Sequence, residues 1–163
     1  MSDPVSDTIA LLESGNESET TTAATRLGLL LERARFRRRG SGTLGDVDAL
    51  LGDLAELEVS DADVRDALDG LRRHLKERGL HSNPTVIWAI GKAHDRDAAD
   101  LVAELAQQAI DQLQTSDLLY QALVMLATVA PGSHRSLFVR AAQDTIGESA
   151  EFAAHQASIS GWL

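Results

Sequence analysis

The 163 residues of this chain include 25 acidic and 15 basic side chains, which gives a formal net charge of −10. A chain this acidic repels phosphate backbones and anionic membrane surfaces, so its overall charge disfavours nucleic acid as a partner. The absence of cysteine excludes a disulfide framework, thiolate metal sites and a cysteine nucleophile.

Hydrophobic residues make up 44% of the chain and aromatic residues only 4%, so the core must consist mainly of leucine, alanine, valine and isoleucine. No run of β-branched residues alternates with polar ones, which leaves little from which a sheet could form. We therefore expect one all-α domain over residues 1–163 with about nine helices. No apolar run reaches the roughly 18 residues of a membrane span, and the first residues lack the pattern of a signal peptide. We expect a cytoplasmic protein with no membrane partner.

Four helices are predicted in the N-terminal half, each with apolar residues on one face at the helical period. They cover about residues 4–14, 19–38, 44–57 and 61–78. Residues 40–45 match the G-x-G-x-x-G pattern of dinucleotide sites, but a helix and not a strand precedes them. We interpret residues 39–44 as a possible flexible loop.

Five helices are predicted in the C-terminal half, over residues 83–94, 97–114, 116–130, 134–146 and 149–159. The first and third of these carry almost no charge, whereas the second is sharply amphipathic. A helix that is apolar all round must be covered on more than one side, so these helices should lie in the middle of the fold. Trp162 and Leu163 form an apolar tail that should fold back or dock on a partner.

Three aromatic residues, Trp88, Tyr120 and Phe152, are spaced 32 residues apart, each near the start of a predicted helix. The intervening helices begin near Asp97 and His134, 37 residues apart. Two helices per 32–37 residues resembles the unit of HEAT and armadillo repeats, best over residues 83–160. The resemblance implies an α-solenoid of antiparallel helix pairs; an irregular helical bundle is the alternative.

Basic residues gather at the predicted C-terminal ends of the second and fourth helices. The candidate partner-binding residues are Arg33, Arg35, Arg37, Arg38 and Arg39 in the first cluster and Arg72, Arg73, Lys76 and Arg78 in the second. If the first helix pairs with the second and the third with the fourth, the two helix ends would lie about 10 Å apart and form one basic patch. With that pairing, the first four helices form two pairs, and the fifth helix belongs to neither of them. The patch could bind an acidic partner or a phosphate backbone; alternatively, the arginines complement helix dipoles and pair with neighbouring carboxylates.

No motif for catalysis or cofactor binding stands out. The five histidines are scattered without H-E-x-x-H spacing, and neither G-x-S-x-G nor a Walker-type loop occurs. The segment from His94 to Asp100 is rich in aspartate but lacks the glycine and closing glutamate of a calcium loop. We therefore predict no enzyme, no catalytic residue, no metal site and no cofactor.

Two hypotheses of function follow. The first is a non-enzymatic protein–protein interaction module or scaffold, such as an adaptor or an immunity or antitoxin protein, which would bind another protein through a groove or an acidic face. The acidic face would carry Asp100, Glu104 and Asp111. The alternative is a nucleic-acid-associated protein that binds phosphates through the clusters 33–39 and 72–78. The oligomeric state stays open.

Overall fold

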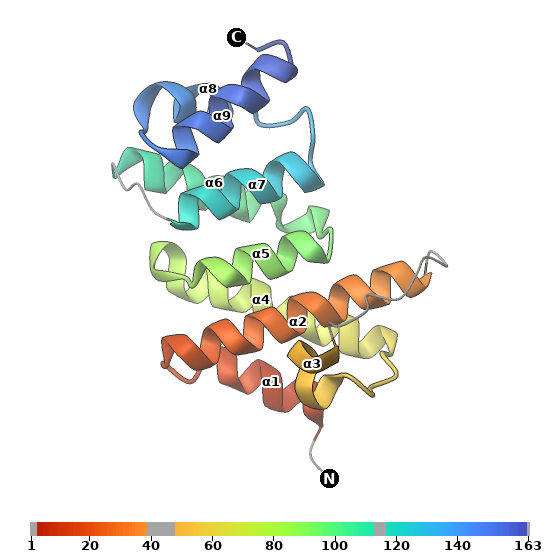
Figure 1. The fold of residues 1–163 in the computed structure, drawn as a ribbon. Coiled ribbons are helices and arrows are strands. Elements are labelled where there is room, and N and C mark those ends of the chain that lie inside the picture. The colour runs from red at the N-terminus through yellow and green to blue at the C-terminus, as the bar shows by residue number, and fades with distance from the viewer. Residues whose placement is uncertain (1–2, 39–47, 113–116, 163) are drawn as a thin grey trace.

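The computed structural model describes residues 3–38, 48–112 and 117–162, which form helices joined by short turns (Figure 1). These residues contain no β-strand, so the prediction of an all-α fold is confirmed. Among them, eight helices have nine or more residues, and α3 has only four. The α-helices are α1 (Pro4–Leu12), α2 (Glu17–Arg38), α3 (Asp48–Leu51), α4 (Asp61–Arg78), α5 (Pro84–Lys92), α6 (Ala99–Asp111), α7 (Asp117–Val129), α8 (Arg135–Asp144) and α9 (Glu148–Ile159). Short 3₁₀ turns are η2 (Gly52–Leu54), η3 (Gly79–His81) and η4 (Arg96–Ala98).

The predicted third helix over residues 44–57 is wrong in extent. Its described part consists of the single turn α3 followed by η2. The chain changes direction at Gly52, whose φ of +59° suits glycine and does not continue an α-helix. The possible loop 39–44 lies outside the described residues.

Helices that follow one another in sequence pack as pairs in the described part of the chain: α1 with α2, α4 with α5, α6 with α7, and α8 with α9 (Figure 1). The pairs stack, so that α2, α5, α7 and α9 follow one another in one layer. In the other layer α1 contacts α4 and α6 contacts α8. The expected pairing of the first helix with the second is confirmed, whereas that of the third with the fourth is wrong: α3 is too short to pair along α4, and the partner of α4 is α5. The first helix, α1, and the last, α9, lie at opposite ends of the stack (Figure 1).

The two apolar helices α5 and α7 lie in the middle of the stack, as their sequences predicted. α5 contacts α2, α4 and α7, and α7 contacts α5, α6 and α9. Ile87 and Ile90 of α5 and Leu119 and Leu123 of α7 are fully buried. Near the end of the chain, Trp162 folds back onto Phe138, with 5.9 Å between the ring centroids. No helix in the described ranges is both long and apolar enough to span a bilayer.

The start of α5 is fixed by polar contacts to α2 and α4. Asn83 caps α5 by accepting a hydrogen bond from the Thr85 backbone N–H (2.9 Å). Its Nδ2 donates to Glu17 Oε2 (3.1 Å) and Thr21 Oγ1 (2.8 Å) of α2. Its backbone N–H donates to Nε2 of His74, a buried side chain of α4 (3.1 Å). The acceptor nitrogen must be unprotonated, so His74 works here in its neutral form.

Acid is expected to weaken the fold through His74. Burial, with the positive charge of Arg78, lowers the pKa of His74, although a hydrogen bond to the Leu12 backbone and the carboxylates of Glu17 and Glu77 act in the opposite direction. The unfolded chain then binds more protons than the folded chain below about pH 6.5, so the stabilisation is complete above that pH and is lost as pH falls toward the lowered pKa.

The measurement is urea unfolding of the wild type and of His74→Gln at a series of pH values from neutral to mildly acidic. The difference in stability between them should be largest at neutral pH, at about 1–3 kcal/mol, and should shrink with acid. His155→Gln, at an exposed position, serves as the control and should keep the pH dependence of the wild type. A difference that stays constant with pH would contradict the role given to His74.

A second expected effect concerns the close approach of α2 and α5. A β-carbon added at Gly28 of α2 would lie 2.8 Å from Cζ3 of Trp88 and 3.0 Å from the Cα of Ala89. Gly28→Ala should therefore lower the free energy of unfolding, because overpacking costs about 1–3 kcal/mol and exceeds the gain of about 1 kcal/mol in helix propensity.

Gly91→Ala in α5 is the matched control, since its β-carbon would lie 3.5 Å from Met125 Cγ, an ordinary contact. This variant should be as stable as the wild type or up to about 1 kcal/mol more stable. Chemical denaturation of both variants makes the comparison, and a change of the same sign in both would argue against the close α2–α5 contact.

Candidate functional site

Arg33, the first arginine of the basic end of α2, points inward. Its side chain is buried, and its two Nη atoms donate hydrogen bonds to the backbone carbonyls of Ala55 (2.7 Å), Leu54 (3.0 Å) and Leu57 (3.0 Å). The guanidinium thus satisfies the carbonyls of the turn that follows α3. This position gives Arg33 a structural contact, and its guanidinium does not lie at the surface.

Arg35 does not share the backbone contacts of Arg33. Its guanidinium carbon is 4.9 Å from the centroid of the Phe36 ring, and its Nε is buried with no hydrogen-bond partner. Arg37 and Arg38 end α2, but the structure does not describe their side chains, and Arg39 lies outside the described residues.

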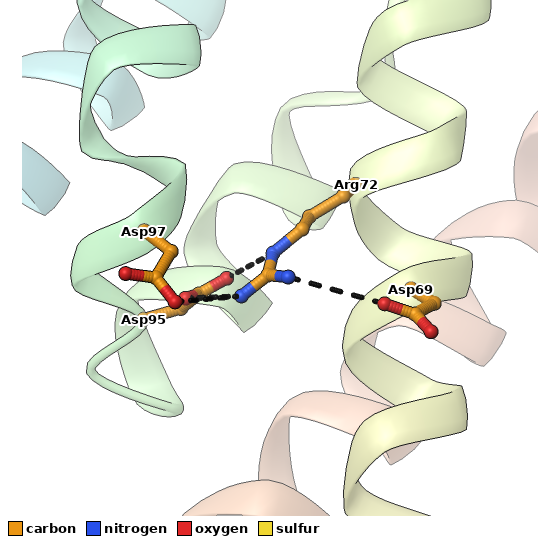
Figure 2. Close-up of polar contacts among 4 residues, drawn as sticks. All are labelled: Asp69, Arg72, Asp95 and Asp97. Carbon is orange, nitrogen blue, oxygen red and sulfur yellow. Dashed lines mark hydrogen bonds and ion pairs between the residues drawn. The ribbon is translucent and has the colours of Figure 1, made fainter.

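Arg72, in the second cluster, forms a bidentate ion pair. Its Nε and Nη2 donate to the two carboxylate oxygens of Asp95, at 2.7 and 2.5 Å. Asp69 (3.9 Å) and Asp97 (4.0 Å) lie on either side of the guanidinium (Figure 2). The hydrogen bonds to Asp95, and then the neighbouring negative charges, hold the pKa of Arg72 above its usual value although burial acts against them. The pair joins α4 to the turn between α5 and η4.

The other basic residues of α4 are closer to solvent. Arg73 pairs with Glu13 at 3.2 Å, and both side chains are about half exposed. Lys76 is exposed and Arg78, the last residue of α4, is half-buried.

The C-terminal ends of α2 and α4, which carry the two basic clusters, lie apart, although Arg35 and Arg72 line a common hollow between these helices. The contacts of Asn83 with Glu17 and Thr21 place the C-terminal end of α4 beside the N-terminal end of α2. Arg35 lies 18 residues further along α2 than Glu17, which is about 27 Å along a helix. The two helix ends therefore lie far apart, and the adjacency expected from sequence depended on the wrong pairing of helices.

Two hollows follow α5 on the side where it lies between α2 and α7. The amino-end pocket, of ≈ 550 Å³, lies at the starts of the three helices and is lined by Glu17, Asp117 and Tyr120 among others. The carboxyl-end pocket, of ≈ 290 Å³, lies further along and includes Arg35, Lys92, His94 and Met125. Trp88 of α5 and Gln121 of α7 line both pockets. We call the two pockets together the α5 groove.

The α5 groove follows a short helix that lies between two longer ones. α5 has 9 residues, whereas α2 has 22 and α7 has 13. The sequence pattern predicted a role for Trp88 only in the repeat spacing, and neither Trp88 nor Gln121 was predicted as a lining residue of a groove. The one signal in the sequence was the presence of a large aromatic residue in a helix that otherwise carries small and aliphatic side chains.

The carboxyl-end pocket mixes charge with an apolar floor. Lys92 Nζ lies 3.1 Å from Glu32 Oε2, which ties α5 to α2, and 5.5 Å from the centroid of the Trp88 ring. The floor includes Val124 and Met125 of α7. A further hollow of ≈ 470 Å³ lies among α2, α4 and residues 93–97, and shares Arg35 and His94 with the carboxyl-end pocket.

His94 has an unusual backbone. Its φ is +52°, a left-handed backbone conformation that residues other than glycine adopt at a cost of about 1–2 kcal/mol. It follows α5 at the position where helices often end in glycine: its N–H donates to the Gly91 carbonyl (3.0 Å), and the Asp95 N–H donates to the Ile90 carbonyl (3.4 Å).

The arrangement is suited to binding. In the described ranges, no group of three or more histidine, aspartate or glutamate side chains is placed to hold a metal ion. The α5 groove instead offers an aromatic ring, aliphatic side chains and charged groups at both ends. Comparison of the chain with models of protein families, with curated proteins and with solved structures finds no match. The function of the chain is therefore inferred from the shape and chemistry of the groove.

Proposed function

We propose that this chain is a non-enzymatic interaction module, an α-solenoid similar to HEAT repeats, which binds a segment of another protein in the α5 groove. The observation that carries the proposal is the continuity of the groove: two pockets in succession share Trp88 and Gln121 and follow the length of α5. Aromatic residues and methionine, here Trp88, Tyr120 and Met125, are the types enriched where proteins meet.

The stacking of the helices supports the same proposal. Four successive helix pairs, with one member of each pair in a shared layer, are the arrangement that repeat proteins use to present an extended surface (Figure 1). The three helices that form the groove, α2, α5 and α7, belong to three successive pairs. A partner segment lying across them would contact several repeats at once.

The test is affinity capture from native lysate with the wild type and two variants. Gln121→Trp fills the middle of the groove and should abolish capture of the partner. Gln108→Trp makes the same change on the exposed face of α6 and should leave capture intact. Circular dichroism establishes that both variants are folded. A partner captured equally by both variants would show that the groove is not its binding site.

The alternative, binding of nucleic acid through the basic clusters, has less support. Arg33 and Arg72 use their guanidinium groups in contacts within the chain, and the ends of α2 and α4 lie apart. A salt-dependent shift of DNA or RNA by the wild type, lost when Arg35, Arg37 and Arg38 become alanine, would favour this alternative.

A further inference from the structure

Among the described arginines, Arg26, Arg33 and Arg35 each have a buried Nε without a hydrogen-bond partner, and Arg35 is the one of them that lines the carboxyl-end pocket. Arg33 binds backbone carbonyls, and Arg72, Arg73 and Arg140 bind carboxylates. Arg35 makes no ion pair within the described residues, and its Nε is buried without a hydrogen-bond partner. A guanidinium that only complemented the dipole of α2 would extend into water. Arg35 instead lines the carboxyl-end pocket and also the neighbouring hollow that contains Asp95 and Asp97.

His94 lies in the wall of the same pocket and keeps a backbone conformation that favours glycine. Glycine would end α5 there without strain. Residues held in such conformations concentrate at binding sites, where the side chain is needed for another purpose.

The pocket has a net positive charge in an acidic protein. Its charged side chains are Arg35, Lys92 and Glu32, and the chain as a whole carries −10. Glu32 forms an ion pair with Lys92 at 3.1 Å, which leaves Arg35 as the cation of this pocket that has no carboxylate partner among the described residues. The planar fork of a guanidinium matches the two oxygens of a carboxylate.

We propose that the carboxyl-end pocket is the specificity pocket of the α5 groove and receives an acidic side chain, aspartate or glutamate, of the bound segment. Arg35 would bind the carboxylate, Lys92 and His94 would lie beside it, and the aliphatic part of the side chain would rest on Trp88. The inference depends on the proposed function, because it names the chemistry of the partner in the same groove. Two successive pockets along one groove suit an extended segment, whose side chains enter them one after the other, better than a helix about 10 Å wide.

A displayed library of random 12-residue peptides, selected on the wild-type protein, is the probe. The selected peptides should lose binding to Gln121→Trp and should carry aspartate or glutamate at one fixed position. In a synthetic copy, the change of that residue to asparagine or glutamine should weaken binding by about ten- to a hundredfold in fluorescence anisotropy. Arg35→Glu should weaken it similarly, and a peptide with arginine at that position should regain binding to this variant.

The two histidines with positive φ provide a matched pair of variants. His94 has φ +52°, and His134, the N-cap residue of α8, which does not line the α5 groove, has φ +62°. Both His94→Gly and His134→Gly should raise the midpoint of thermal unfolding, because glycine relieves the strain. Only His94→Gly should weaken the binding of the selected peptides, by about tenfold. Unchanged affinity in His94→Gly would remove His94 from the site.

The outcomes separate this inference from the proposed function. Peptides that depend on the groove but show no preferred acidic position would overturn the acidic-side-chain assignment and leave the proposed function standing. A selection that yields no peptide sensitive to Gln121→Trp would contradict both.

Discussion

Replacement of Asp95 by alanine is expected to lower the free energy of unfolding by about 3 kcal/mol. The side chain of Asp95 is only 4% exposed, and it accepts both hydrogen bonds of the Arg72 fork. Its loss leaves the partly buried guanidinium without the carboxylate that compensates its desolvation. Because Arg72 is 25% exposed and retains Asp69 and Asp97 nearby, the loss should fall at the lower end of the range for buried pairs.

Glu13→Ala is the matched control, since it removes the carboxylate partner of the next arginine, Arg73. Both side chains of that pair are about half exposed, so the variant should lose less than about 1 kcal/mol. Urea unfolding at neutral pH and constant salt measures both variants. Equal losses would mean that the Arg72–Asp95 pair behaves as a surface contact and does not hold α4 to the turn after α5.

Leu123→Ala is expected to cost about 2–5 kcal/mol, enough to unfold a domain of marginal stability. Leu123 is fully buried in α7, which contacts helices on several sides. The cavity left by the missing atoms would be enclosed by neighbouring side chains that cannot collapse into it fully.

The same substitution at Leu50 of α3 provides the comparison, because that side chain is 59% exposed. Leu50→Ala should change the free energy of unfolding by less than about 0.5 kcal/mol. Guanidinium unfolding followed by circular dichroism measures the two variants side by side. A small effect at Leu123 would contradict the central position of α7.

Much of the secondary structure could be predicted because its signals are local. Ser60 and Asn83 cap α4 and α5 as their sequence contexts indicate, and apolar stripes mark the faces that are buried. The third helix was predicted too long because its apolar spacing continues through Gly52, where the backbone turns. This error also shifted the predicted pairs, because the helices were paired in chain order and the third was therefore paired with the fourth.

The candidate site depends on contacts that are distant in sequence, and these could not be predicted. Arg33 reaches carbonyls 21 to 24 residues away, and Arg72 reaches Asp95 across 23 residues. A cluster of arginines in the sequence looks the same whether its members face water or the protein interior. The exposed face of Trp88 likewise depends on where α2 and α7 lie, which no local pattern of α5 records.

Binding of a protein segment in the α5 groove is tested most directly by the two tryptophan indole signals in a nitrogen–proton correlation spectrum. The chain contains two tryptophans. Trp88 lies where the two pockets of the groove meet, and Trp162 packs on Phe138 near the far end of the stack. When the captured partner or a selected peptide is added, the indole signal of Trp88 should shift while that of Trp162 stays in place. A shift of Trp162 with Trp88 unchanged would contradict binding in the α5 groove.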